Sequence, residues 1–356
     1  MDILLTVTVL AALAVLQSLL ISRFGLKGFS YRREFSRREA AAGETVEYTE
    51  VIRNNGPLLL PWVRLESRMP TSFEFRTREE VEIRSGRYHK SVFTLSPFCQ
   101  VTRRHRVVLR QRGHYVLAQT AMTMGDLLGL NPVIRDLDAP AEIYVYPAPP
   151  EEDPSVPASR EQGEVSVPRW IQPDPFLVNG IRPYRSGDPE RNVHWNATAR
   201  TGELQVKTMD HTSCPRLMVL INSQLRQDQW GDLTEEEQPR VEQAISLAAA
   251  LCLDALGKGM EAGFAANMPL DEDDADALML PARGTGWETE LLRAFACLRV
   301  RRTLRFPTFL SQLPPLPGTD ILILSCYDSE DIREGMQRLA YAGASVSLRV
   351  IRGGAS

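Results

Sequence analysis

An uninterrupted apolar segment at the start of the chain constrains its fold more than any other feature of the sequence. Residues 3–21 carry no charged side chain. A helix over this range, at ~1.5 Å per residue, is about 28 Å long, close to the ~30 Å hydrocarbon core of a bilayer. A secretory signal peptide is the alternative, but Asp2 stands where such peptides are basic, and the apolar run is longer than theirs. We therefore predict a transmembrane helix over residues 1–22.

The residues after this segment indicate on which side of the membrane the rest of the chain lies. Basic side chains outnumber acidic ones there, namely Arg23, Lys27, Arg32, Arg33, Arg37 and Arg38 against Glu34 and Glu39. The positive-inside rule then places the bulk of the chain in the cytoplasm, and we expect these arginines to lie on anionic headgroups. The five cysteines include no Cys-x-x-Cys pair, which fits reduced thiols in that compartment. The net charge of −4 gives no case for nucleic-acid binding.

Residues 23–146 have the pattern of short β-strands. Apolar and polar residues alternate over 44–52, 62–66, 81–83, 88–95, 104–109 and 143–146, with a strong turn at Asn54-Asn55-Gly56-Pro57. Short strands at such intervals predict an antiparallel β-sandwich of the immunoglobulin or fibronectin kind. We expect His105 and His114 to lie at its surface or at strand edges.

The remainder of the chain is α/β after a proline-rich linker over 147–179. Strands are predicted over 216–222, 261–267, 277–280, 319–325 and 345–351, and helices over 239–257, 288–300 and 330–342. Strands that alternate with helices predict a mostly parallel sheet with right-handed crossovers. We assign residues 208–356 to this domain.

Residues 180–207 form a dense motif between the two predicted domains. Asp188 as N-cap and Pro189 at the first helical position predict a short helix that Gly202 ends, followed by a strand with Leu204 and Val206. One reading is structural: the arginines and Asp188 form a semi-buried ion network, with Trp195 as a core anchor. The other is that the arginines bind carboxylates or phosphates of a partner. The alternating charges favour the structural reading.

This motif carries a resemblance to a known family. The pattern comprises Arg182, Tyr184, Gly187, Asp188, Arg191, Trp195, Ala199 and Arg200. It resembles the signature of the bacterial domain of unknown function 58 family, whose genes often neighbour MoxR-type AAA+ ATPases. The resemblance implies a membrane anchor, a β-rich segment, the motif and a von Willebrand factor A-like domain, in the order found here. It also implies the bacterial cytoplasmic membrane as the location.

The loops after the predicted parallel strands are poor in metal ligands. A metal-ion-dependent adhesion site in such a fold needs an Asp-x-Ser-x-Ser loop and a further aspartate, because hard divalent cations require oxygen ligands. Asn222, Ser223 and Gln224 follow the first strand, and Ser325 and Cys326 stand where the later aspartate would be. We therefore predict a degenerate site without bound metal, and no cofactor. A zinc site from His194, His211 and Cys214 is disfavoured by its irregular spacing.

Three functional classes follow from these features. We favour a membrane-anchored, non-catalytic scaffold or adaptor, which by the family resemblance works with a MoxR-type ATPase in protein maturation or assembly. Metal-independent ligand binding by the A-like domain is the alternative. A hydrolase using Asp188, His194 and Cys214 is less favoured, because no Gly-x-Ser-x-Gly, P-loop or paired-carboxylate motif supports it. No catalytic residue is therefore assigned.

Overall fold

The structure is a computed structural model that describes residues 2–75, 88–129, 131–150, 178–184, 193–209, 215–229, 231, 233–270 and 275–351. The chain divides into two compact units, Met1–Ala148 with Leu292–Cys297, and Pro149–Leu291 with Leu298–Ser356. The five-part division predicted from sequence is finer than this and stays a prediction. Most of the predicted linker and the strand predicted over 81–83 lie outside the described residues.

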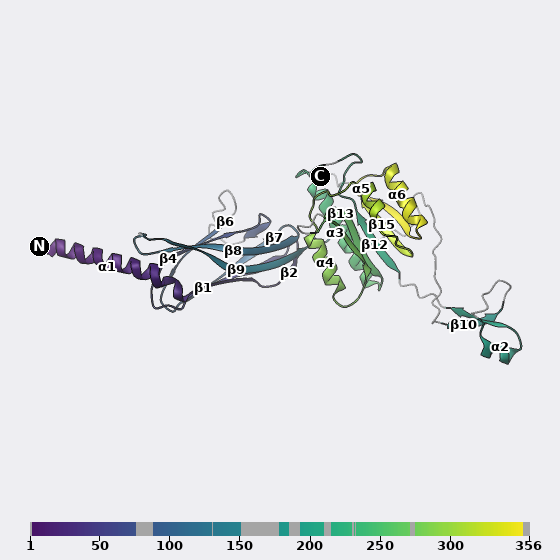
Figure 1. Cartoon of the computed structure of the whole chain (residues 1–356), viewed down its shortest axis with the longest axis horizontal. Helices are drawn as coiled ribbons and strands as arrows, with labels where there is room; N and C mark the ends of the chain where they lie inside the picture. Colours follow the sequence, from purple (N-terminus) through teal and green to yellow (C-terminus); the bar gives the residue numbers. More distant parts are fainter. Residues whose placement is uncertain are drawn as a thin grey trace. The chain divides into compact units, whose positions relative to one another are not determined.

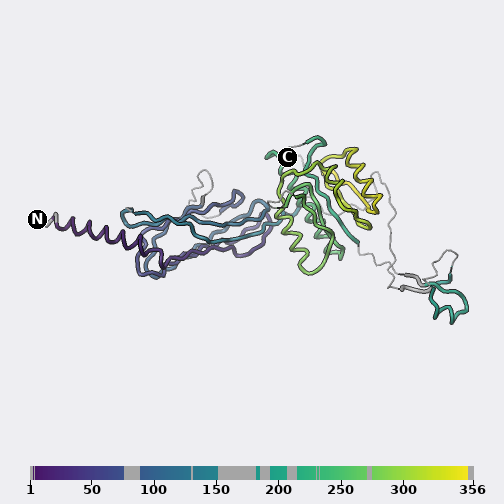
Figure 2. The backbone as a smooth tube through the Cα atoms, in the orientation of Figure 1, coloured from purple at the N-terminus to yellow at the C-terminus, as the bar shows by residue number. Residues whose placement is uncertain are grey.

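The first unit begins with the predicted apolar helix. Helix α1 spans Asp2–Phe24 and continues into a single 3-10 turn, η1, over Gly25–Gly28. Within the described residues, one helix is both long enough and apolar enough to cross a membrane, and it is this one. Its most apolar window has a mean hydropathy of 2.2. The backbone then runs from η1 into the first strand (Figure 2).

The β-rich part of this unit consists of two sheets (Figure 1). One sheet has the order β1-β3-β7-β5 and is antiparallel throughout. The other has the order β2-β9-β8-β4-β6 and is antiparallel except for the short β2–β9 pairing. The strands are β1 (Phe29–Phe35), β2 (Glu39–Ala41), β3 (Thr45–Asn54), β4 (Leu60–Arg68), β5 (Phe73–Phe75), β6 (Tyr88–Leu95), β7 (Gln100–Leu109), β8 (Gly113–Gly125) and β9 (Val133–Tyr146).

Side chains from the two sheets meet in apolar clusters between them. Tyr48 and Val107 from one sheet pack in one cluster with Ile143 from the other, and all three are buried. A second cluster joins Ile52 of β3 with Leu65 of β4. Two facing sheets that share buried side chains form the predicted sandwich core.

Two expectations about this unit are wrong. Arg33 does not lie on lipid headgroups: its guanidinium is buried, with Nε donating to Ala139 O at 2.6 Å and Nη1 donating to Ser67 Oγ at 3.0 Å. Its position in β1 faces the sandwich interior, because successive side chains of a strand alternate between faces. His105 is buried as well, whereas His114 is partly exposed and pairs with Glu142.

The second unit contains a five-stranded sheet with the order β14-β13-β12-β15-β16. The pairs β12–β13, β12–β15 and β15–β16 are parallel, and the edge pair β13–β14 is antiparallel. The strands are β12 (Arg216–Ile221), β13 (Glu261–Pro269), β14 (Asp276–Ala282), β15 (Thr319–Ser325) and β16 (Ser345–Val350). The strands predicted from apolar runs therefore lie close to the observed ones, while the von Willebrand A assignment stays a prediction.

Helices cover this sheet, as the alternation of strands and helices predicts. They are α3 (Gln238–Gly257), α5 (Phe306–Gln312) and α6 (Glu330–Tyr341), and a fourth helix, α4 (Trp287–Cys297), has Trp287–Leu291 in this unit. Phe306 and Leu310 of α5 and Ile332 of α6 pack with Ile321 and Ile323 of β15 in one buried cluster. Helix α5 was not predicted from sequence, because only seven residues form it and Pro307 stands near its start.

The signature motif forms a small hairpin around a short helix. Strand β10 (Val178–Pro183) pairs antiparallel with β11 (Gln205–Met209), and α2 (Trp195–Thr201) lies between them in the sequence. Gly202 ends α2 with a φ of 74°, as its position predicts. The predicted Asp188 cap and the start of the predicted helix at Pro189 lie outside the described residues. The prediction that this helix continues unbroken to Gly202 is wrong, because Val193 pairs with Val206 in a β-bridge and His194 caps α2.

Candidate functional sites

The signature segment is the first candidate site, and part of it lies within the described residues. Arg182, Tyr184, Trp195 and Arg200 are described, whereas Gly187, Asp188 and Arg191 are not. Trp195 begins α2 with 69% of its surface exposed, and α2 buries no side chain. The prediction that Trp195 is a core anchor is therefore wrong, because a seven-residue helix beside a two-stranded sheet offers little surface to cover an indole.

His194 has a structural role in the same segment. Its Nδ1 accepts a hydrogen bond from the backbone N–H of Ala197 at 3.1 Å, as an N-cap side chain does. A nitrogen that accepts this bond cannot also act as a base or ligand without releasing the helix end. Asp188, His211 and Cys214 lie outside the described residues, so the hydrolase and zinc hypotheses stay untested.

The carboxyl edge of the parallel sheet is the second candidate site. Asn222 directly follows β12, and Ser325 ends the neighbouring strand β15. Asn222 Nδ2 donates to Ser325 Oγ at 3.0 Å, and Asn222 Oδ1 accepts from the Gln224 N–H at 2.9 Å. The Ser223 N–H donates to Asn267 Oδ1 at 2.8 Å. These buried polar groups satisfy one another, so the loop is held by internal amide and hydroxyl contacts.

Gln224 occupies a position where a metal site would present a hydroxyl, and its amide is fully used by the backbone. Its Oε1 accepts from the Phe306 N–H at 2.7 Å, and its Nε2 donates to Gln229 O at 2.7 Å. Cys326 is partly buried, and burial raises the pKa of its thiol, so it offers a neutral thiol rather than a hard anionic ligand. Asp328 pairs with Arg333, whose Nε donates to Asp328 Oδ1 at 3.1 Å.

A buried cation lies beside this edge. The side chain of Arg302 is 1% exposed, and Nη1 donates to Gly231 O at 3.0 Å. Its Nε donates to Ser223 O at 3.3 Å, and Nη2 lies 3.4 Å from Glu237 Oε2. Burial would raise the pKa of the Glu237 carboxyl, but bonds from Thr234 N–H and Gln229 and the charge of Arg302 outweigh it and lower that pKa. No local sequence pattern indicates this role of Arg302, because its partners all lie in the connection between β12 and α3, 65 to 79 residues earlier in the chain.

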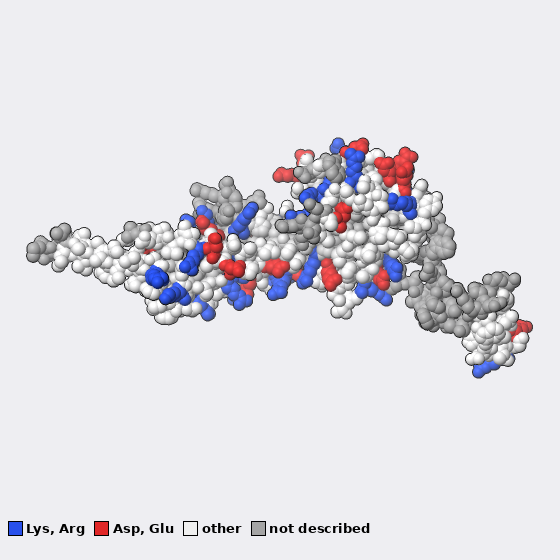
Figure 3. Space-filling view, in the orientation of Figure 1, with Lys and Arg blue, Asp and Glu red and all other residues white. Residues whose placement is uncertain are grey.

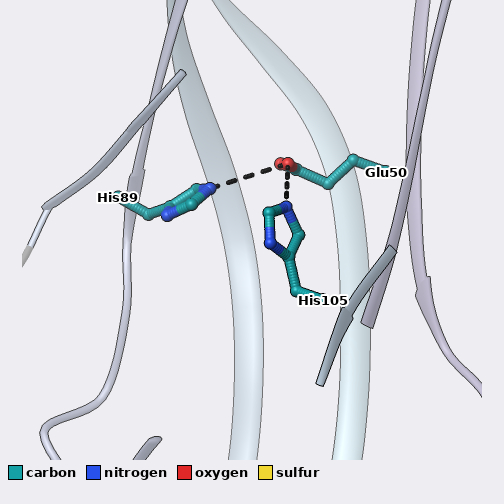
Figure 4. Close-up of side chains that lie close together, drawn as sticks. All are labelled: Glu50, His89 and His105. Carbon is teal, nitrogen blue, oxygen red and sulfur yellow. Dashed lines mark ion pairs between the residues drawn. The ribbon is translucent and has the colours of Figure 1, made fainter. Parts of the chain in front are cut away.

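The third candidate site lies inside the β-sandwich and was missed by sequence reasoning. Glu50 of β3 and His105 of β7 lie on neighbouring strands of one sheet, and His89 comes from β6 of the other (Figure 4). Glu50 Oε2 is 3.5 Å from His105 Nε2 and 3.7 Å from His89 Nε2. All three residues are buried. No local motif joins them, so only the pairing of strands brings them together.

Hydrogen bonds and packing fix this cluster in place. The Tyr31 hydroxyl donates to Glu50 Oε1 at 2.6 Å, and the Phe75 ring stacks on His89 at a centroid distance of 5.3 Å. Burial alone would raise the pKa of the Glu50 carboxyl, but the imidazoles of His105 and His89 and the Tyr31 hydroxyl outweigh it and hold that pKa well below its usual range. The carboxylate is therefore ionised inside the core.

Comparisons of the sequence with known proteins found a family model and a relative that match parts of the chain. Residues 180–320 match the sequence model of the family described as "Protein of unknown function DUF58". The chain is 22% identical over 254 residues to the "Uncharacterized protein YeaD" of Bacillus subtilis (strain 168), a match that covers 70% of this chain and 59% of that protein. The chain thus spans about three fifths of that relative's length.

Solved structures similar to part of the chain were also found. A CARDB domain from Pyrococcus furiosus, solved with di-metal ions, is 12% identical with a TM-score of 0.22, and the match covers 33% of this chain and 93% of that one. A non-cellulosomal cohesin from Archaeoglobus fulgidus is 12% identical with a TM-score of 0.24, covering 33% of this chain and 91% of that one.

The fold and these sites define a class of protein before any family is considered. It has an N-terminal helix apolar enough to span a membrane, a β-sandwich and an α/β sheet whose carboxyl edge is closed by internal hydrogen bonds. The motif and the family match then place residues 180–320 in the DUF58 family, a family of unknown function.

Proposed function

We propose that this protein is a single-pass, membrane-anchored adaptor that presents its α/β domain and its signature segment to another protein in the cytoplasm. The family resemblance points to a MoxR-type AAA+ ATPase as that partner, with a role in maturation or assembly of other proteins. The observation that carries the proposal is the exposed Trp195 in the segment of the family match. A large exposed aromatic residue in a segment that also carries Arg200 and Tyr184 has the composition of a binding hot spot.

The strand order of the second unit supports a von Willebrand A-like reading of its α/β domain. The first strand, β12, is central, and the antiparallel strand β14 forms one edge. Ligands of such sheets bind at the carboxyl ends of the strands. Asn222, Ser223, Gln224 and Ser325 offer no carboxylate there, and Arg302 adds a positive charge close by, so a hard divalent cation has no suitable ligand set. We infer that this domain binds its partner without Mg²⁺.

The basic residues at the end of α1 and directly after it support the proposed orientation. Arg23 stands in the last turn of α1 and Lys27 follows in η1. The positive-inside rule then puts both units in the cytoplasm of a bacterial cell. A reporter fused after Ser356 should be active only in the cytoplasm, and activity of a periplasm-specific reporter at that position would overturn the orientation.

A binding measurement with purified partners tests the adaptor role. The full chain, reconstituted in nanodiscs, is titrated with a purified MoxR-type ATPase from the same organism, with and without ATP. Trp195→Ala should weaken binding by 10-fold or more, as hot-spot truncations costing about 2 kcal/mol do. Val116→Ala is the control, since Val116 is a 54% exposed residue of the sandwich strand β8, outside the domain and the segment proposed to bind. Equal affinities for both variants, or no binding by the wild type, would refute the proposal.

A further inference from the structure

The Glu50–His89–His105 cluster has the composition and spacing of a metal site. Glu50 Oε2 lies 3.5 and 3.7 Å from the two Nε2 atoms, and one ligand atom from each of the three residues lies within 4.8 Å of the others. In a tetrahedral zinc site with bonds of about 2.0–2.1 Å, neighbouring ligand atoms are about 3.3 Å apart. The observed separations are longer than ordinary hydrogen bonds and close to what a shared cation requires.

Unsatisfied polar atoms in the cluster are a second observation that points to a ligand. Glu50 is 1% exposed, and within the described residues neither its Oε2 nor His89 Nδ1 has a hydrogen-bond partner. A buried carboxylate oxygen without a partner is costly. Arg33, the cross-strand neighbour of Glu50, is not the partner of the Glu50 carboxylate, since its guanidinium donates to Ala139 O and Ser67 Oγ.

We propose that Glu50, His89 and His105 bind one divalent transition-metal ion of the Zn²⁺ type between the two sheets. Two imidazoles and one carboxylate are ligands that such ions prefer. Tyr31 orients the carboxylate from outside the ligand set, as second-shell partners do. Phe75 lies against both imidazoles, at ring distances of 5.3 Å to His89 and 5.9 Å to His105. The ion would therefore tie β3, β6 and β7 together rather than meet a substrate.

Calorimetry on the full chain in detergent tests this site. Metal-free protein is titrated with Zn²⁺, and we expect one ion per chain and a higher melting temperature. Glu50→Gln and His105→Gln should weaken binding by more than about 100-fold, and Tyr31→Phe by about 10- to 100-fold. His114→Gln is the control: it removes a histidine of the same sandwich that also contacts a glutamate, and it should bind as the wild type does.

Two outcomes would overturn the zinc proposal. One is the absence of stoichiometric binding by the wild type, and the other is unchanged affinity in Glu50→Gln and His105→Gln. If the substituted chains do not fold, X-ray absorption of the wild-type complex decides between the alternatives. Two imidazoles and one carboxylate around zinc support the site, whereas any sulfur ligand contradicts it.

A separate observation concerns the end of the sandwich that packs on α1. Ile21 of α1 is buried in the same apolar cluster as Leu60 and Met124. At the end of the helix, a Cβ added to Gly25 would lie 2.5 Å from Met124 Cε. Asn131 Nδ2, in the connection between β8 and β9, donates to Ser18 Oγ at 2.8 Å. The helix and this end of the sandwich are therefore one packed body.

The loops at this end expose large apolar side chains. Leu127 and Leu128, between β8 and β9, are 64% and 66% exposed, and Phe98 is 72% exposed. The loop that carries Phe98 lies at the same end of the sandwich. The Phe98 N–H donates to Gly56 O, and the neighbouring Asn55 N–H donates to Gly28 O of η1. Residues 3–22 of α1 include no Lys, Arg, Asp or Glu, and the described part of this stretch is drawn white in Figure 3.

The point at which the β8–β9 connection contacts α1 sets how deep that connection lies in the bilayer. It reaches Ser18, which lies three residues, or about 4.5 Å, inside the end of the apolar run at Ile21. We infer that Leu127 and Leu128 enter the same leaflet as the end of α1, so that the sandwich contacts lipid as well as being tethered to it. This inference rests on the membrane anchoring proposed above. Its occupant is the lipid bilayer, because the patch is continuous with the membrane-spanning helix.

Fluorescence from labelled cysteines tests this contact. Leu128→Cys and the control Val116→Cys, a 54% exposed position of β8, are made in a chain whose native cysteines are replaced by serine, and each is labelled with an environment-sensitive dye. In vesicles with nitroxide-bearing lipids, the dye at 128 should be quenched at least several-fold more than the dye at 116. Failure of the chain to float with vesicles would refute the anchor itself. Flotation with equal quenching at both positions would refute the loop contact alone.

Discussion

Replacing Arg302 with methionine should destabilise the α/β domain strongly. The side chain is 1% exposed, and it donates to Ser223 O and Gly231 O and pairs with Glu237. Each lost hydrogen bond to a charged group costs about 1.5–3 kcal/mol, and breaking a buried ion pair costs about 3–5 kcal/mol. These contributions overlap, and Glu237 is partly solvated, so we expect a loss of about 3 kcal/mol. A domain of ~200 residues should then melt about 6–12 °C lower.

Hydrogen exchange of the full chain in detergent measures this effect where it arises. A loss of 3 kcal/mol, at about 1.4 kcal/mol per factor of ten, should lower the protection of β12 and α3 amides roughly 100-fold, while sandwich amides stay unchanged. Arg305→Met is the matched control, because Arg305 is exposed and its replacement should change stability by less than about 0.5 kcal/mol. A change in protection below about 3-fold in Arg302→Met would refute the view that Arg302 organises the sheet edge.

Three further predictions concern other positions. Trp195→Ala should change the free energy of unfolding by less than about 0.5 kcal/mol in urea titrations, because the indole is 69% exposed; a loss above about 2 kcal/mol would restore the core-anchor reading. Gly263→Ala should lower stability by about 1–3 kcal/mol, because the added Cβ would lie 2.3 Å from Met279 O of the neighbouring strand; an unchanged melting temperature would contradict this. Cys99 should react with maleimide in the native protein, whereas Cys252 is buried, burial raises its pKa, and mapping by mass spectrometry should find it labelled only after unfolding.

The elements that the sequence predicted well are those with a strong local signal. The strands over Thr319–Ser325 and Tyr88–Leu95 and the helix over Gln238–Gly257 agree with their predicted bounds to within a residue. Apolar runs and helical periodicity are properties of consecutive residues, so they can be read without knowing the partners. The strand over Phe29–Phe35 was missed because its arginines indicated a solvated segment, although one of them, Arg33, faces the core.

The candidate sites were predicted less well, because their members are brought together by pairing between distant strands. The degenerate edge around Asn222 and Ser325 could be located, since strand ends in a parallel sheet meet at one edge. The contacts of Arg302 could not be predicted from one sequence. Trp195 was assigned to a core by residue type alone, and the small hairpin that carries it leaves it on the surface.

The sequence by itself determined the apolar N-terminal helix, the change from β-sandwich to α/β and the family signature, since each depends on composition or on short-range spacing. Only the tertiary structure decided that Glu50, His89 and His105 share a buried site, that Arg302 closes the sheet edge, and that the β8–β9 connection lies beside α1. The physical reason is that these contacts join residues far apart in the chain, and the packing of sheets and helices sets their distances.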